Sequence, residues 1–110
     1  MKLPSSEQAV VPEKKLTGYI LSETHAVGRF KAKFFRQLGF NETNVDSLRK
    51  EIINLAQTQE VKGVETSIYG TKYIVEGTIM TPIGKSVKIR TVWIVEKGKD
   101  QPIFVTVYPA

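Results

Sequence analysis

The chain contains no cysteine and only one histidine among its 110 residues. Without cysteine it can form neither disulfides nor zinc–thiolate sites, and thiol catalysis is excluded. A single imidazole likewise excludes a multi-histidine metal centre within one chain. A carboxylate-only Mg²⁺ or Ca²⁺ site stays open, but the sequence shows no clustered Asp/Glu motif. We therefore predict no metal site and no cofactor.

Long hydrophobic runs are also absent. No apolar stretch approaches the roughly 20 residues that a membrane span needs. Residues 1–12 lack the apolar stretch of a signal peptide. We therefore expect a cytoplasmic protein without a membrane partner. The length fits one domain, residues 1–110, with one modest core.

What the sequence has in excess is positive charge. Sixteen Lys and Arg stand against eleven Asp and Glu, which gives a net charge of +5. Such a charge favours polyanionic partners, namely RNA, other nucleic acids or an acidic protein. The same net charge is equally expected if it serves only to keep the protein soluble.

The first half of the chain has helical periodicity. An extended lead-in over residues 1–11 precedes a helical part over residues 12–58. Three helices are expected, over residues 12–22, over residues 29–38 and from Asn44 onward. In the second, the four-residue repeat of Phe30, Phe34 and Leu38 indicates the buried stripe. The apolar face of the third is formed by Leu48, Ile52, Leu55 and Ala56.

The second half, residues 61–108, has the composition of strands. Segments rich in Val, Ile, Thr and aromatics cover residues 61–69, 72–80, 86–96 and 102–108. The short breaks between them favour antiparallel pairing, because parallel strands need long crossovers. The sequence therefore predicts an α+β fold, with N-terminal helices packed on one face of a four-stranded antiparallel meander sheet.

Alternation along the strands assigns the two faces of this sheet. The more apolar sets should pack on the helices; they are Val87, Ile89, Thr91, Trp93 and Val95, followed by Ile103, Val105 and Val107. The opposite face is mixed and carries Glu76, Arg90, Thr106 and Tyr108. Such a face is either a substrate platform or an ordinary solvated surface.

The only histidine, His25, precedes a dense basic segment. Its cations are Arg29, Lys31, Lys33 and Arg36, at the predicted start of a helix. Metal-free RNA cleavage needs a proton carrier that works near neutrality and cations for the charge that develops on phosphate. The same pattern also fits a loop histidine in a structural role beside a solvated helix face.

Arg90 is unusual because a cation within a strand needs a partner. That partner is either a carboxylate such as Glu76, which makes a structural ion pair, or a substrate phosphate. Tyr108, on the same face, suits either base stacking or packing at the edge of the sheet.

Three groups of strings together resemble one known family. They are Thr24-His25 with Gly28-Arg29, Lys31-Ala32-Lys33-Phe34-Phe35 and Leu38-Gly39-Phe40; Tyr69-Gly70-Thr71-Lys72-Tyr73 with Val75-Glu76-Gly77; and Arg90-Thr91-Val92-Trp93, Glu96-Lys97-Gly98 and Thr106-Val107-Tyr108-Pro109. The chain resembles a small bacterial domain family of unknown function, whose members occur alone and as C-terminal modules of large polymorphic toxins. The resemblance spans Leu3 to Pro109.

The layout of this family looks like the fold of barnase, EndoU, colicin nuclease domains and RelE-type toxins, which are metal-independent ribonucleases. The resemblance implies His25 as general base or acid, with Arg29, Lys31 and Arg90 holding phosphate. It also implies an acidic immunity or antitoxin partner. With one histidine, any second acid must be a tyrosine, lysine or arginine.

The sequence thus predicts a ribonuclease-like domain. Its candidate catalytic residues are His25, Arg29, Lys31, Arg90 and Tyr108, and its candidate substrate-binding residues are Lys33, Arg36, Thr106 and Glu76. The alternative is a non-catalytic basic module that binds nucleic acid or an acidic protein. A structural domain with incidental charge is the third reading.

Overall fold

A computed structural model describes residues 1–26 and 29–110. The helical part comprises the 3₁₀ turn η1 (Ser6–Gln8), α1 (Glu13–Lys15), the π-helical turn η2 (Leu16–Ile20), α2 (Arg29–Gln37) and α3 (Val45–Thr58). The strands are β1 (Val61–Ser67), β2 (Gly70–Met80), β3 (Ser86–Glu96) and β4 (Ile103–Pro109). The predicted α+β order of helices followed by strands is confirmed.

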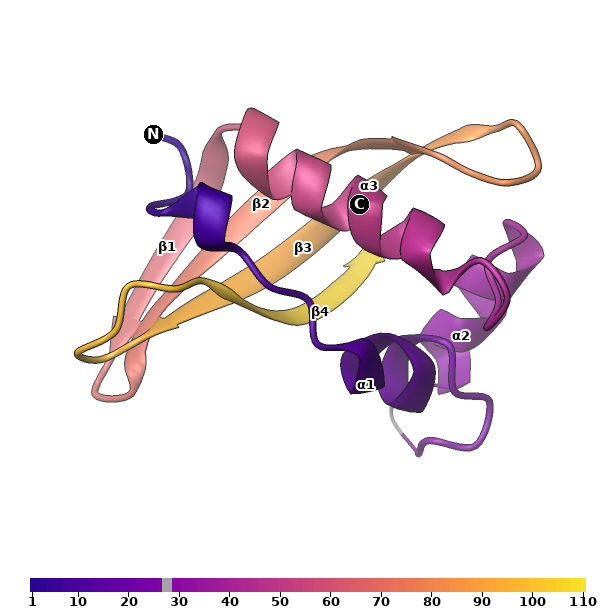
Figure 1. Ribbon diagram of the computed structural model, residues 1–110, viewed down its shortest axis with the longest axis horizontal. Helices are drawn as coiled ribbons and strands as arrows, with labels where there is room; N and C mark the ends of the chain where they lie inside the picture. Colours follow the sequence, from indigo (N-terminus) through magenta and orange to yellow (C-terminus); the bar gives the residue numbers. More distant parts are fainter. Residues whose placement is uncertain (27–28) are drawn as a thin grey trace.

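The four strands form one antiparallel sheet in the order β1-β2-β3-β4. Helix α3 runs across one face of this sheet, while α1 and α2 lie beside one another near β4 (Figure 1). Meander order follows from the short connections, which allow only neighbouring strands to pair antiparallel. No helix in the described parts of the chain is long and apolar enough to cross a membrane.

The core lies between α3 and the sheet. The predicted face of α3 is buried, with Leu48, Ile52 and Leu55 no more than 2% exposed, and it packs in one cluster with Trp93 of β3. Gly77 of β2 permits this close approach, since a Cβ there would lie 2.5 Å from Leu55 Cδ2. The face of β3 that was predicted to be apolar is therefore the face that α3 covers.

The start of α3 was predicted from Asn44, which does stand at the N-cap position. Its side chain, however, does not cap the helix. Instead Asn44 Oδ1 accepts a hydrogen bond from the Asn41 amide at 2.8 Å, and Nδ2 donates to the Gly39 carbonyl at 2.8 Å. The asparagine thus fixes the turn that follows α2, where Gly39 has a φ of 97°.

The buried stripe of α2 differs from the prediction. Ala32 and Phe35 are fully buried, whereas Phe30 is 70% exposed; Phe34 and Leu38 are only partly buried. A strict four-residue repeat drifts by about 40° per step around a helix of 3.6 residues per turn, so its first member leaves the core face. The small Ala32 and the aromatic Phe35, three residues apart, provide the contact.

In β4 the predicted core set is also corrected. Val92 of β3 pairs with Thr106 of β4, whereas the next residue of β3, Trp93, pairs with Phe104. Val105 is therefore an extra residue of β4 and forms a bulge. The bulge changes the side on which earlier residues of β4 point. Phe104 is consequently buried, with its ring 5.7 Å from that of Trp93.

The lead-in over residues 1–11 crosses from β1 to β4 and is interrupted by η1 (Figure 1). Val10 forms a parallel bridge with Ile103, and the Phe104 amide donates to the Val10 carbonyl at 3.0 Å. Leu3 and Val11 are buried in the core cluster. This segment therefore covers the outer edge of β4 where that strand begins.

Candidate functional site

The face of the sheet opposite α3 carries a cross-strand row of polar residues. Glu76 of β2 pairs in register with Arg90 of β3, and Arg90 pairs with Tyr108 of β4. Thr106 lies two residues before Tyr108 and therefore on the same side. We call the side that carries these four residues the polar face.

Arg90 has a protein partner on this face. Its guanidinium forms an ion pair with the Glu76 carboxylate, and Lys88 Nζ lies 3.8 Å from the other carboxylate oxygen. The Glu76 side chain is 10% exposed and that of Arg90 is 41% exposed. The hydrogen bond to Glu76 raises the pKa of Arg90 above its ordinary value. The carboxylate thus orients the guanidinium, which still faces solvent.

Two cations lie over the ring of Tyr108. The Arg90 guanidinium carbon is 5.7 Å from the centre of the Tyr108 ring, and Lys31 Nζ is also 5.7 Å from it. At these distances each cation interacts with the electron-rich face of the ring. The ring therefore holds the two positive groups on the same region of the polar face.

Lys31 brings helix α2 to this region. Its ammonium donates one hydrogen bond to the Thr106 hydroxyl at 2.7 Å and another to the Tyr19 hydroxyl at 3.1 Å. Lys31 therefore reaches β4 from α2. Three segments that are distant in sequence meet at this one nitrogen.

Tyr19 was not among the predicted site residues. It belongs to the π-helical turn η2, where the Leu21 amide donates to the Leu16 carbonyl at 2.6 Å. The hydrogen bond from Lys31 lowers the pKa of Tyr19 below its ordinary value. No local signal in the sequence marks Tyr19 as the neighbour of a lysine 12 residues later.

His25 borders the group through Tyr19. The two rings meet edge to face, with their centres 4.8 Å apart. The backbone amide of His25 donates to Ser22 Oγ at 3.2 Å, and the residue is half-buried. His25, Tyr19, Lys31, Thr106, Tyr108, Arg90 and Glu76 thus form one connected set, which we call the Lys31 cluster.

Within the part of the chain that the structure describes, no side-chain contact links Arg29 or Lys33 to the Lys31 cluster. The Arg29 guanidinium lies over the Phe30 ring at 5.0 Å, while its amide donates to the His25 carbonyl at 3.0 Å. Lys33 is exposed. Gly28, which belongs to the strings that carry the family resemblance, lies outside the described residues.

Arg36 serves the loop that carries His25. Its Nε and Nη2 donate to the Leu21 carbonyl at 3.0 and 2.7 Å. The same guanidinium pairs with Glu23 at 3.0 Å and with Glu42. These contacts tie the last turn of α2 to residues that precede and follow the helix in the sequence.

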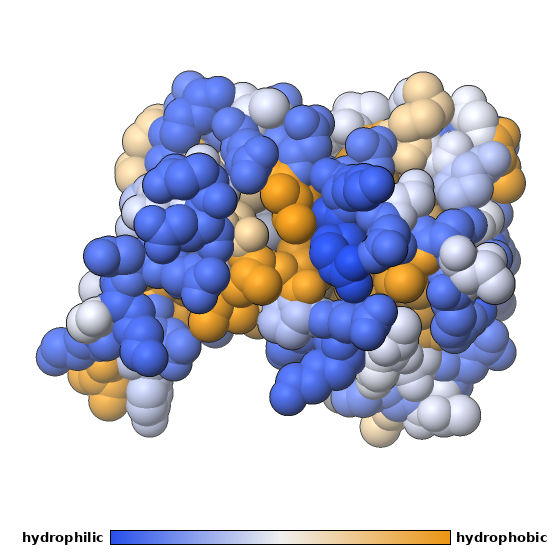
Figure 2. Space-filling model, in the orientation of Figure 1, coloured by the Kyte–Doolittle hydropathy of each residue, from blue (hydrophilic) through white to orange (hydrophobic). Residues whose placement is uncertain are grey.

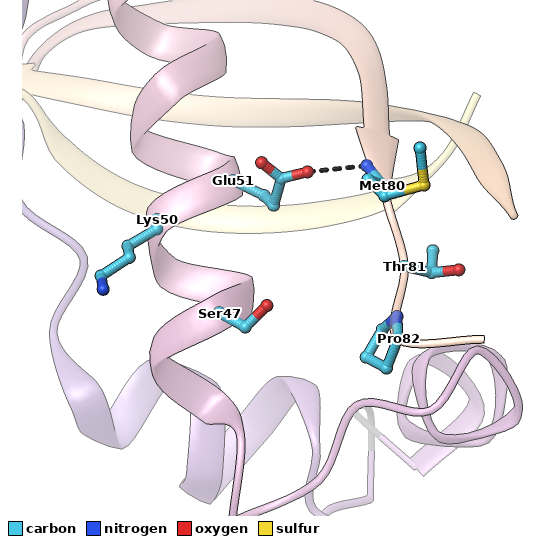
Figure 3. Close-up of a pocket in the computed structure, with 6 residues that line it drawn as sticks. All are labelled: Ser47, Lys50, Glu51, Met80, Thr81 and Pro82. Atoms are coloured by element: carbon cyan, nitrogen blue, oxygen red, sulfur yellow. Dashed lines mark hydrogen bonds between the residues drawn. The ribbon is translucent and has the colours of Figure 1, made fainter. Parts of the chain in front are cut away.

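A pocket of about 510 Å³ opens elsewhere, between α3 and the end of β2 (Figure 3). It is lined by Ser47, Lys50, Glu51, Met80, Thr81 and Pro82, none of which was predicted as a site residue. Its carboxylate is already engaged, since Glu51 accepts the Met80 N–H at 2.7 Å. Figure 2 shows the side covered by α3, where hydrophilic residues predominate.

The described residues contain no group of three or more potential metal ligands from His, Cys, Asp and Glu. The Lys31 cluster offers an ammonium, a guanidinium that is paired with a carboxylate, two phenols, an imidazole and a hydroxyl. Such groups bind phosphate, stack on bases and carry protons.

None of the curated proteins compared with this chain matches its sequence. Among solved structures, a chain of a contact-dependent growth inhibition toxin–immunity protein complex from Klebsiella pneumoniae 342 shares the fold, with a TM-score of 0.75 at 20% identity. The match covers 94% of this chain and 95% of that one. Residues 2–110 match the family described as "Domain of unknown function (DUF6883)". The chain therefore belongs to this family, whose function its description leaves open.

Proposed function

We propose that this protein is a small metal-independent endoribonuclease of the kind used as a toxin module, with its active site on the polar face of the sheet. The observation that carries the proposal is the position of Lys31. Its ammonium joins α2 to Thr106 and lies over Tyr108, whose ring also receives Arg90. Two cations from distant segments are thus brought together at one aromatic ring.

In this proposal Lys31 and Arg90 bind the scissile phosphate. Arg90 is held by Glu76 and still has a side chain that is 41% exposed, so a phosphate oxygen can approach it. Fixed cations at the phosphate stabilise the charge that develops on its oxygens during cleavage. Tyr108 keeps the two cations together beside the phosphate, because both lie over its ring.

His25 supplies the proton transfer. Histidine is the side chain that most often acts as a general base, so His25 is suited to remove the proton of a ribose 2′-hydroxyl. Its ring reaches the cluster through Tyr19 at 4.8 Å. Arg36 supports this arrangement because it anchors the Leu21 carbonyl, four residues before His25.

The similarities support the toxin part of the proposal. The solved chain with the same fold comes from a complex of a growth inhibition toxin and its immunity protein. The family resemblance drawn from the sequence implies the same setting, and the helix-then-meander order suits the ribonuclease folds named above. Fold similarity alone is a weak argument for activity, so the residues of the Lys31 cluster carry the claim.

The proposal is tested by incubating the protein with mixed RNA in EDTA. We expect cleavage that does not require a metal and ends in 2′,3′-cyclic phosphates. His25→Ala should reduce the rate by about 10² to 10⁴-fold, the range for loss of a general base. It should leave the circular dichroism spectrum and melting temperature close to those of the parent. A variant that cleaves as fast as the parent would remove His25 from the mechanism.

A second candidate function is binding of an acidic protein on the same face without catalysis. The net charge of +5 and the exposed cations of the polar face favour it. It predicts salt-sensitive association with an acidic partner and no RNA product. Charge reversal at Lys31 and Lys33 should weaken that association, and unchanged affinity would count against it.

A further inference from the structure

We propose that Tyr19 is a catalytic residue, the general acid that donates its phenolic proton to the leaving 5′ oxygen. The inference rests on the proposed ribonuclease function and completes it. The sequence contains a single histidine, which serves as the base, so a second proton carrier has to come from another residue type. Tyr19 is the phenol that contacts both His25 and Lys31.

The geometry around the phenol suits this role. Lys31 Nζ donates to the Tyr19 oxygen at 3.1 Å and to Thr106 Oγ1 at 2.7 Å, so the phenol is held at the margin of the phosphate-binding cations. Lys15 Nζ lies 5.8 Å from the centre of the same ring. Both positive charges stabilise the phenolate that remains after proton donation. The lowered pKa of Tyr19 agrees with this surrounding.

The backbone that carries Tyr19 is itself unusual. Tyr19 lies in η2, a five-residue π-helical turn over Leu16–Ile20. Single π turns are rare in proteins. Those that do occur are often found at functional sites, because they change the direction in which side chains leave the helix. Here the flanking Leu16 and Ile20 are fully buried. These two side chains fix the turn against the core, and Tyr19 accepts the hydrogen bond from Lys31.

The reaction balances with these two groups. His25 removes the 2′-hydroxyl proton as the 2′ oxygen forms a bond to phosphorus. The bond between phosphorus and the 5′ oxygen breaks, and that oxygen takes the proton of Tyr19. The products are a 2′,3′-cyclic phosphate and a 5′-hydroxyl, and proton exchange with water restores the imidazole and the phenol. No oxidant, metal or further reactant is needed.

The test compares two dinucleotide substrates, one ordinary and one with sulfur in place of the bridging 5′ oxygen. A thiolate has a conjugate acid of pKa near 8.5, so it leaves without a proton donor. Tyr19→Phe should slow cleavage of the ordinary substrate by about 100-fold or more, and cleavage of the sulfur substrate by less than about 3-fold. Tyr69→Phe, at the exposed tip of the β1–β2 hairpin, is the matched control and should cleave both like the parent.

Two results would overturn the assignment while leaving the ribonuclease intact. One is a Tyr19→Phe variant as active as the parent on the ordinary substrate. The other is an equal loss on both substrates, which would give Tyr19 only a role in positioning Lys31. If the parent cleaves neither substrate, the proposed function fails and the role of Tyr19 fails with it.

Discussion

The Lys31 ammonium lies 2.7 Å from the Thr106 hydroxyl oxygen and joins α2 to β4 across 75 positions of the sequence. The bond is part-buried. It links the helix that follows His25 to the polar face of the sheet. We therefore expect the stability of the domain and the arrangement of the candidate site to depend on this bond.

Thr106→Val should lower the free energy of unfolding by about 1 kcal/mol, because the substitution keeps the shape of the side chain but removes the oxygen that accepts from Lys31. Urea denaturation measures the change. Thr78→Val, at an exposed position of β2, is the matched control and should change stability by less than about 0.5 kcal/mol. Equal effects of the two substitutions would show that the bond to Lys31 contributes nothing.

Lys31→Met should raise the pKa of Tyr19 towards its ordinary value. The hydrogen bond from the ammonium is the largest cause of the lowered pKa, since it stabilises the phenolate. Ultraviolet difference titration follows the ionisation, and comparison with Tyr19→Phe identifies which of the four tyrosines is observed. Lys62→Met, in the exposed part of β1, should leave the titration unchanged. A Tyr19 titration unaltered by Lys31→Met would contradict the contact.

Glu42→Gln should reduce stability at neutral pH but not in acid. The hydrogen bond from Arg36 lowers the pKa of Glu42 in the folded protein below the value of about 4.3 expected when unfolded. A lowered carboxyl pKa contributes stability above the unfolded value, and this contribution is lost as pH falls through the folded value. The urea midpoints of parent and variant should therefore differ at pH 7 and converge as the pH falls through the folded pKa of Glu42. A difference that stays the same as the pH falls would argue against the pair.

Gly70→Ala should be far more destabilising than Gly84→Ala. Both glycines have positive φ, at 146° and 83°, which costs a residue with a side chain about 1–2 kcal/mol. At Gly70 an added Cβ would also lie 2.3 Å from the Val95 carbonyl oxygen, whereas at Gly84 it meets nothing within 4 Å. We expect a loss well above 2 kcal/mol for the first and about 1–2 kcal/mol for the second. Similar melting temperatures for the two variants would contradict the close approach at Gly70.

The sequence predicts the sheet well because strand pattern and connection length are local properties. The predicted limits of the third strand, residues 86–96, agree with β3, and its apolar face is the one that α3 covers. The prediction fails where packing decides. Phe30 lies on a regular repeat yet is exposed, and Phe104 is buried only because a bulge at Val105 changes its direction.

Local strand pattern also predicts part of the candidate site, namely the residues that share the polar face. Strand alternation places Arg90, Thr106 and Tyr108 on one face without knowledge of the fold, and the in-register row with Glu76 follows from the meander. The position of Lys31 against Thr106 depends on how α2 docks, which no local pattern encodes. Tyr19 was missed because its π-helical turn and its bond to Lys31 both arise from tertiary packing.

The most direct test of the ribonuclease site is the rate of RNA cleavage in EDTA by the parent, Lys31→Met and Lys62→Met. In the proposed site Lys31 binds the phosphate, whereas Lys62 is exposed on β1, so the two substitutions remove the same charge from different places. The account predicts a loss of about 100-fold or more for Lys31→Met and an unchanged rate for Lys62→Met. Cleavage by Lys31→Met at the parental rate, or no cleavage by the parent, would contradict it.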